Sequence, residues 1–97
     1  MIKVTLDGKH MKTKKTVHLY MKNVLNSEEY YGNNLDALYD VLSTYSEPIE
    51  IVLINKHILI ENLGDYGKSL IKLFEDVEEE NTNIKFKIDQ WRSFFFI

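Results

Sequence analysis

The stretch that decides the fold runs from residue 30 to residue 40 and consists of Tyr30-Tyr31-Gly32-Asn33-Asn34-Leu35-Asp36-Ala37-Leu38-Tyr39-Asp40. Two aromatic residues and a glycine precede Asn34, which is suited to cap a helix that we expect over residues 34–44. At 100° per residue, the apolar side chains of this helix gather on one face, and they are Leu35, Leu38, Tyr39 and Leu42. We therefore expect an amphipathic helix that packs this face into a core.

The opposite face of the same helix carries two carboxylates. Asp36 and Asp40 are neighbours at positions i and i+4, where like charges cost roughly 0.2–0.5 kcal/mol. A helix that keeps both of them beside tyrosines is suited to a positively charged partner. An alternative exists for Asp36, because a carboxylate in the first turn interacts favourably with the helix dipole, worth roughly 0.3–1 kcal/mol. Asp40 lies too far inside the helix for that explanation.

Length and composition indicate one globular domain over residues 1–97, with residues 89–97 as a C-terminal extension. The chain is 44% hydrophobic and contains no cysteine. The absence of cysteine excludes a disulfide framework, a thiolate metal site and a cysteine nucleophile. No apolar run approaches the ~20 residues of a membrane span, and the N-terminus lacks the apolar segment of a signal peptide. We expect a cytoplasmic location and no membrane partner.

The net charge of −3 conceals a strong segregation along the chain. Residues 1–27 hold six lysines against one aspartate, whereas residues 28–80 hold thirteen acidic residues against three lysines. Residues 81–97 are again slightly basic. The acidic block disfavours nucleic acid as a partner, because binding to phosphates requires Lys and Arg. It favours a basic protein, although a solvated acidic surface without a partner is an equal alternative.

Periodicity outside the central helix predicts a mixed fold. Alternation at residues 2–6, a β-branched run at 49–54 and a second alternation at 84–88 predict three strands, the middle one buried on both faces. Helices are expected from Thr16 to Asn26 and from Lys68 to Glu80. Residues 9–15 are predicted to be a loop, and 55–63 a short helix or an irregular turn. The inner side of the last helix is predicted to be Leu70, Ile71, Leu73, Phe74 and Val77. Strands alternating with helices indicate an α/β domain with a small three-stranded parallel sheet.

The central stretch resembles the barstar family of intracellular ribonuclease inhibitors. The resemblance rests on the pattern Tyr-Tyr-Gly-x-Asn-Leu-Asp-Ala-Leu-aromatic-Asp over residues 30–40, with a weaker match at Leu73-Phe74-Glu75-Asp76. It covers about residues 1–88 and implies the same α/β architecture. It also implies a non-enzymatic protein that binds and occludes the basic active site of a secreted, barnase-like ribonuclease, as an immunity protein in a bacterial cytoplasm.

The resemblance implies a partner-binding surface on residues at matching positions, namely Tyr30, Gly32, Asn34, Asp36, Tyr39, Asp40, Tyr45 and Asp76. In this interpretation Asp40 takes the place of a substrate phosphate and accepts bidentate hydrogen bonds from arginine. Asp36 and Asp76 add flanking ion pairs, and the tyrosines supply rigid contact area. Two alternatives stay open, since Asp76 could belong to a solvated helix end and Tyr39 could serve the core first.

Enzymatic interpretations have little support in the chain. His10, His18 and His57 lack the spacing of metal ligands and are expected to be surface or packing residues. No nucleophile motif or phosphate-binding glycine loop accompanies the aspartates, and two adjacent carboxylates make an incomplete metal site. We therefore expect neither catalysis, nor a cofactor, nor a metal.

Two other functions remain as alternatives. The chain could be a structural or regulatory module that binds another basic protein, or an immunity protein against a toxin that is not a ribonuclease. The apolar tail at Trp91 and residues 94–96 is expected to cover the domain's own surface or to form a homo-oligomer contact, because such a segment would otherwise favour aggregation.

Overall fold

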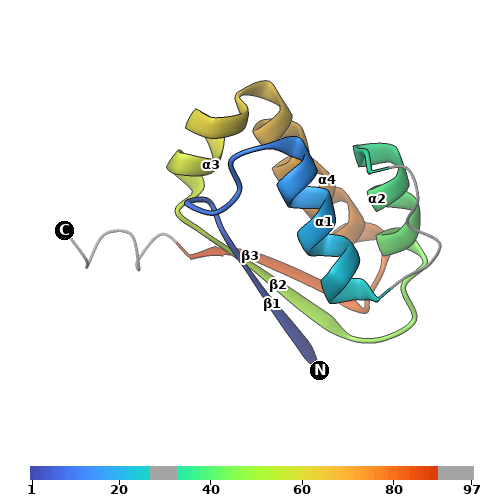
Figure 1. Cartoon of the computed structure of the whole chain (residues 1–97). Helices are drawn as coiled ribbons and strands as arrows, with labels where there is room; N and C mark the ends of the chain where they lie inside the picture. Colours follow the sequence, from blue (N-terminus) through green and yellow to red (C-terminus); the bar gives the residue numbers. More distant parts are fainter. Residues whose placement is uncertain (27–32, 90–97) are drawn as a thin grey trace.

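The computed structural model describes residues 1–26 and 33–89. These residues form strands β1 (Ile2–Asp7), β2 (Ile49–Ile54) and β3 (Ile84–Asp89), and helices α1 (Lys14–Leu25), α2 (Leu35–Ser43), α3 (Lys56–Leu63) and α4 (Asp65–Glu80). The strands make one parallel sheet in the order β1-β2-β3, and α1, α2 and α4 gather on one side of it (Figure 1). The predicted α/β fold with a three-stranded parallel sheet is confirmed.

Alternation along the strands directs apolar side chains toward the helices. The register places Val4 and Phe86 on either side of Ile51, and Val4 and Ile51 are buried. The predicted burial of β2 on both faces is only partly right. On its second face Val52 is buried, but Glu50 is half-buried, and its carboxylate lies 3.6 Å from the ammonium group of Lys3. Polar side chains of the outer strands therefore border this face.

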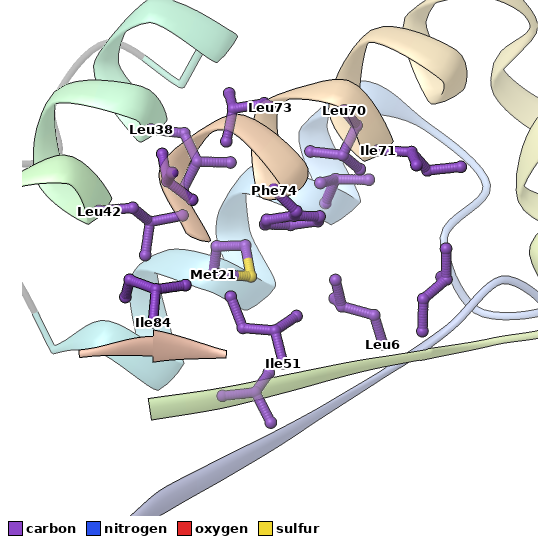
Figure 2. Packing of buried hydrophobic residues seen from close by; sticks show 14 of the residues in the cluster. Leu6, Met21, Leu38, Leu42, Ile51, Leu70, Ile71, Leu73, Phe74 and Ile84 are labelled. Carbon is purple, nitrogen blue, oxygen red and sulfur yellow. The ribbon is translucent and has the colours of Figure 1, made fainter. Parts of the chain in front are cut away.

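The core lies between the sheet and the helices, where Phe74 packs among side chains from every layer (Figure 2). Its ring centroid is 5.1 Å from that of Phe86 in β3. All five residues predicted for the inner side of the last helix are buried. Leu38 and Leu42 of α2 are fully buried, which confirms the apolar face of the central helix. Burying one such leucine stabilises a fold by about 1.5–3 kcal/mol, so α2 is firmly attached to the domain.

Two helix starts differ from the prediction. α1 begins at Lys14, because the side chain of Thr13 accepts a hydrogen bond of 3.1 Å from the backbone N–H of Thr16, so the predicted loop is too long. α4 begins at Asp65, not Lys68, and includes Gly67. A Cβ atom at Gly67 would lie 3.2 Å from the Leu59 carbonyl oxygen, so glycine there allows α3 to approach α4 closely. Residues 55–63, predicted as a short helix or an irregular turn, contain helix α3.

Candidate protein-binding surface

The N-terminus of α2 is held by a side-chain cap, as predicted. The Asn34 side-chain oxygen accepts a hydrogen bond of 2.8 Å from the backbone N–H of Ala37. Asn33 precedes it with a φ of 49°, a left-handed conformation that asparagine tolerates better than most residues. The cap fixes the position at which the helix begins, and thereby the direction in which the exposed carboxylates of Asp36 and Asp40 point. The first turn contains Asp36, so its interaction with the helix dipole is also satisfied.

A groove of about 360 Å³ lies between α2 and α4. It brings together three of the predicted site residues, Asp36, Tyr39 and Asp76. Leu35 and Leu73 also line it, and Lys68, Ser69 and Lys72 border it from α4. The groove exists because Leu38 and Leu42 of α2 anchor that helix beside Leu73 and Phe74 of α4 (Figure 2). Carboxylates from two distant segments of the chain thereby share one surface.

Tyr39 links the two helices. Its phenol donates a hydrogen bond to the Glu80 carboxylate at the end of α4. This hydrogen bond, reinforced by burial and by the negative charges of Glu80, Asp76 and Asp40, raises the pKa of Tyr39 above its ordinary value. Tyr39 also packs against the core while remaining half-buried, so it serves both the core and the surface. We call Asp36, Asp40, Asp76 and Glu80, together with Tyr39, the acidic surface.

Asp76 is not a free carboxylate in this arrangement. The Lys72 ammonium group donates a hydrogen bond of 2.9 Å to it, one helical turn away. The pair raises the pKa of Lys72, mainly through this hydrogen bond and the Asp76 charge. The Lys72 side chain is 71% exposed, so water screens this pair and it contributes little to the stability of the fold. A partner could therefore displace Lys72 from Asp76 at small cost.

Asp40 occupies a different position from the other aspartates. It lines a separate shallow hollow of about 320 Å³ with Val41, Ser43 and Thr44, and is itself exposed. Its own backbone carbonyl accepts hydrogen bonds from the Ser43 and Thr44 hydroxyls, which strengthens the end of the helix. The Asp40 carboxylate forms no ion pair within residues 1–26 and 33–89. It is thus accessible to a partner's cation.

The remaining predicted residues are placed differently. Tyr45 is half-buried against the core, and its carbonyl oxygen accepts hydrogen bonds from the side chains of Asn81 and Asn83 at 3.0 and 3.1 Å. These bonds tie the end of α2 to the turn before β3. Tyr30 and Gly32 lie outside the described residues, and their roles stay predictions. So does that of the tail beyond Asp89.

Glu80 was missed by the sequence reasoning. It lies four residues after Asp76, the same i, i+4 spacing that drew attention to Asp36 and Asp40. On α4 this spacing places Glu80 and Asp76 on one helix face. The contact with Tyr39 joins residues 41 positions apart and carried no local signal.

Among the described residues, no group of three or more His, Cys, Asp or Glu side chains could hold a metal ion. No described helix is long and apolar enough to cross a membrane. His18 is fully buried and hydrogen-bonded to the Tyr66 hydroxyl, while His10 and His57 are exposed. The histidines are therefore packing and surface residues, as predicted.

Fold and site together define the class, a small α/β domain with carboxylates from two helices grouped around a tyrosine. The family model described as "Barstar (barnase inhibitor)" matches residues 1–90. A protein of Bacillus subtilis (strain 168), named "Putative ribonuclease inhibitor YrdF", is 33% identical over 81 residues, which cover 82% of this chain and 89% of that protein. The chain belongs to the barstar family. Members of this family are inhibitors rather than enzymes, and the family implies a ribonuclease as partner.

Proposed function

We propose that the chain inhibits a secreted, basic, barnase-like ribonuclease by covering its active site with the acidic surface. The observation that carries this proposal is the grouping of Asp36, Asp76 and Glu80 around Tyr39, with Asp40 exposed beside them. The charges of Glu80, Asp76 and Asp40 act on Tyr39, and Asp36 lines the same groove as Tyr39 and Asp76. The family membership supplies the class of partner.

The chemistry of ribonucleases explains why carboxylates suit this task. An RNA-cleaving site holds phosphate groups with Arg, Lys and His side chains. A carboxylate in the position of the phosphate accepts charge-assisted, bidentate hydrogen bonds from arginine. Asp40 is assigned this central role, because it is exposed and its carboxylate has no cation partner among the described residues.

The neighbouring residues have supporting roles in this proposal. Asp36 and Asp76 pair with cations at the rim of the enzyme site. Asn34 fixes the start of α2, and thereby the presentation of both aspartates. Tyr39 holds α2 to α4 through Glu80, so the surface is formed before the partner arrives. Preorganised groups lose less conformational freedom on binding, which strengthens the complex. Tyr30, Gly32 and Tyr45 complete the contact area.

The biological role follows from the target. A ribonuclease destined for secretion endangers RNA in the cell that makes it, so its inhibitor is needed in the bacterial cytoplasm. A second candidate, supported by the acidic surface alone, is binding of another basic protein, such as a toxin that does not cleave RNA.

The test is inhibition of RNA cleavage by barnase and by barnase-like secreted ribonucleases, combined with titration calorimetry. Wild type, Asp40→Ala and the control Glu61→Ala are compared, because Glu61 is an exposed acid on α3. We expect tight inhibition by wild type and Glu61→Ala, and a loss for Asp40→Ala. Absence of inhibition of every ribonuclease would favour the second candidate, and equal affinities of wild type and Asp40→Ala would remove the central role of Asp40.

A further inference from the structure

The lysines of the acidic block are not scattered. Residues 28–80 contain only Lys56, Lys68 and Lys72 as cations, against thirteen acidic residues. Lys68 and Lys72 border the groove between α2 and α4. Lys56 and Lys68 line a second groove of about 330 Å³, with Ile60 and Ile71. Because Lys68 belongs to both grooves, the three lysines form one continuous strip, which we call the lysine flank.

The helices give no stabilising reason for two of these positions, those of Lys56 and Lys68. Lys56 is the first residue of α3, and Lys68 is the fourth residue of α4. Both lie in the first turn of a helix, where the helix dipole disfavours a cation. Lys68 and Lys72 are also like charges at i and i+4, which repel each other. Within residues 1–26 and 33–89, Lys72 pairs with Asp76, but neither Lys56 nor Lys68 forms an ion pair. Lys56 and Lys68 are thus available to another molecule, and Lys72 becomes available when its exposed pair with Asp76 opens.

The lysine flank adjoins the acidic surface. Lys68 and Lys72 share their groove with Asp36 and Asp76, so the sign of the charge changes along one face of the molecule. The isoleucines of the second groove give the basic end an apolar floor, since Ile71 is only 7% exposed and Ile60 packs against the core. A partner with a uniformly basic surface would be attracted at one end of this face and repelled at the other.

We propose that the lysine flank binds acidic side chains of the partner ribonuclease that border its basic active site. This inference rests on the proposed function and adds the charge pattern of the enzyme that is bound. The partner presents arginine or lysine to Asp40 and Asp36, and a carboxylate to Lys68. Such a pattern fixes the orientation of the complex and rejects ribonucleases that carry a cation at that edge.

The experiment measures whether a negative charge in the lysine flank weakens or strengthens binding to the ribonuclease. Lys68→Glu and Lys56→Glu are compared with the control Lys87→Glu. Lys87 is an exposed residue of the edge strand β3. Each variant makes the chain more acidic by the same amount. Folding is not at risk at Lys68, because glutamate in the first turn of a helix is favoured. Dissociation constants are measured by titration calorimetry with the barnase-like ribonuclease that wild type binds most tightly.

The lysine flank predicts that Lys68→Glu and Lys56→Glu weaken binding by about tenfold, because an attraction is replaced by a repulsion. Lys87→Glu should leave the affinity unchanged or raise it slightly. Replacing the opposing enzyme carboxylate by lysine should restore the affinity of Lys68→Glu. If all three variants bind more tightly than wild type, attraction by net charge alone accounts for binding and the lysine flank is wrong. The proposed function survives that result, whereas failure of wild type to bind any ribonuclease overturns both.

Discussion

Tyr39 in α2 donates its phenolic hydrogen to the carboxylate of Glu80, the last residue of α4. The two residues are 41 positions apart, so this bond joins the helix of the central sequence pattern to the helix that supplies Asp76. It lies at the surface, directly beside the carboxylates proposed to contact a ribonuclease. The bond therefore determines how the two halves of the acidic surface are positioned relative to one another.

Glu80→Gln should lower the pKa of Tyr39 toward its ordinary value of 10.0, because the hydrogen bond to the carboxylate is the main cause of its elevation. Since the folded-state pKa lies above the unfolded-state value, the stabilisation by this bond is complete below pH 10 and is lost as the pH rises through the folded-state pKa. The measurement is the alkaline absorbance titration of phenolate, with Tyr39→Phe identifying the contribution of Tyr39 among six tyrosines. An unchanged titration in Glu80→Gln would show that the bond does not form.

His18 should make the protein less stable in mild acid. Burial lowers its pKa below the ordinary value of 6.5, and it lies on α1 against Tyr66, whose ring is also contacted by the Lys14 ammonium group at 4.6 Å. Because the unfolded chain binds this proton more readily, stability is full above about pH 6.5 and falls as the pH drops toward the folded-state pKa.

Urea unfolding at pH 8 and pH 5.5 tests this pH dependence. His57→Gln should retain the loss of stability seen in wild type, whereas His18→Gln, although less stable overall, should show a smaller loss between the two pH values. An equal loss in both variants would assign the acid sensitivity to other groups.

Asp40→Ala should separate binding from folding. The side chain is exposed on the face of α2 opposite Leu38 and Leu42, so the unfolding free energy should change by no more than about 0.5 kcal/mol. Affinity should fall by about 3–5 kcal/mol, because the enzyme's arginines would be buried without their counter-charge. Urea melts measure the unfolding free energy, and titration calorimetry measures the affinity for the ribonuclease. A loss of stability as large as the loss of affinity would contradict a role confined to binding.

Asp76→Ala should weaken binding less than Asp40→Ala. The Asp76 carboxylate already accepts a hydrogen bond from Lys72, which an incoming cation must displace, so less of its interaction energy is gained in the complex. Lys72→Met removes this competition and should raise the contribution of Asp76, measured as the coupling between the two substitutions in a double-mutant cycle. If the effects of Asp76→Ala and Lys72→Met on the binding free energy are strictly additive, Lys72 does not compete with the partner's cation for Asp76.

Association should slow as salt is added. The block of residues 28–80 holds thirteen acidic residues, and its field attracts a basic enzyme over distances that salt screens beyond about 8–10 Å. Stopped-flow association rates at low and high ionic strength give the comparison, with dissociation rates as the internal control, because they should vary less. A rate that is independent of salt would argue against steering.

Much of the fold could be predicted because its signals are local. Alternation in the strands and the 100° spacing of Leu35, Leu38 and Leu42 depend only on neighbouring residues. The start of α4 was less predictable, because glycine usually breaks helices. At Gly67 the lack of a side chain instead serves the close approach of α3 to α4, a contact between elements that local pattern does not describe.

The sequence by itself determined that Asp36 and Asp40 lie on an exposed face of one helix, since the apolar residues of that helix occupy the other face. It also determined the acidic character of residues 28–80. The family resemblance already places Asp76 with them. Only the tertiary structure decided that Glu80 joins them through its bond with Tyr39, and that three lysines lie together at the edge of the surface. The physical reason is that packing of α2 against α4 is set by complementary side chains distant in the chain. Helical spacing fixes which residues share a face, but not which faces meet.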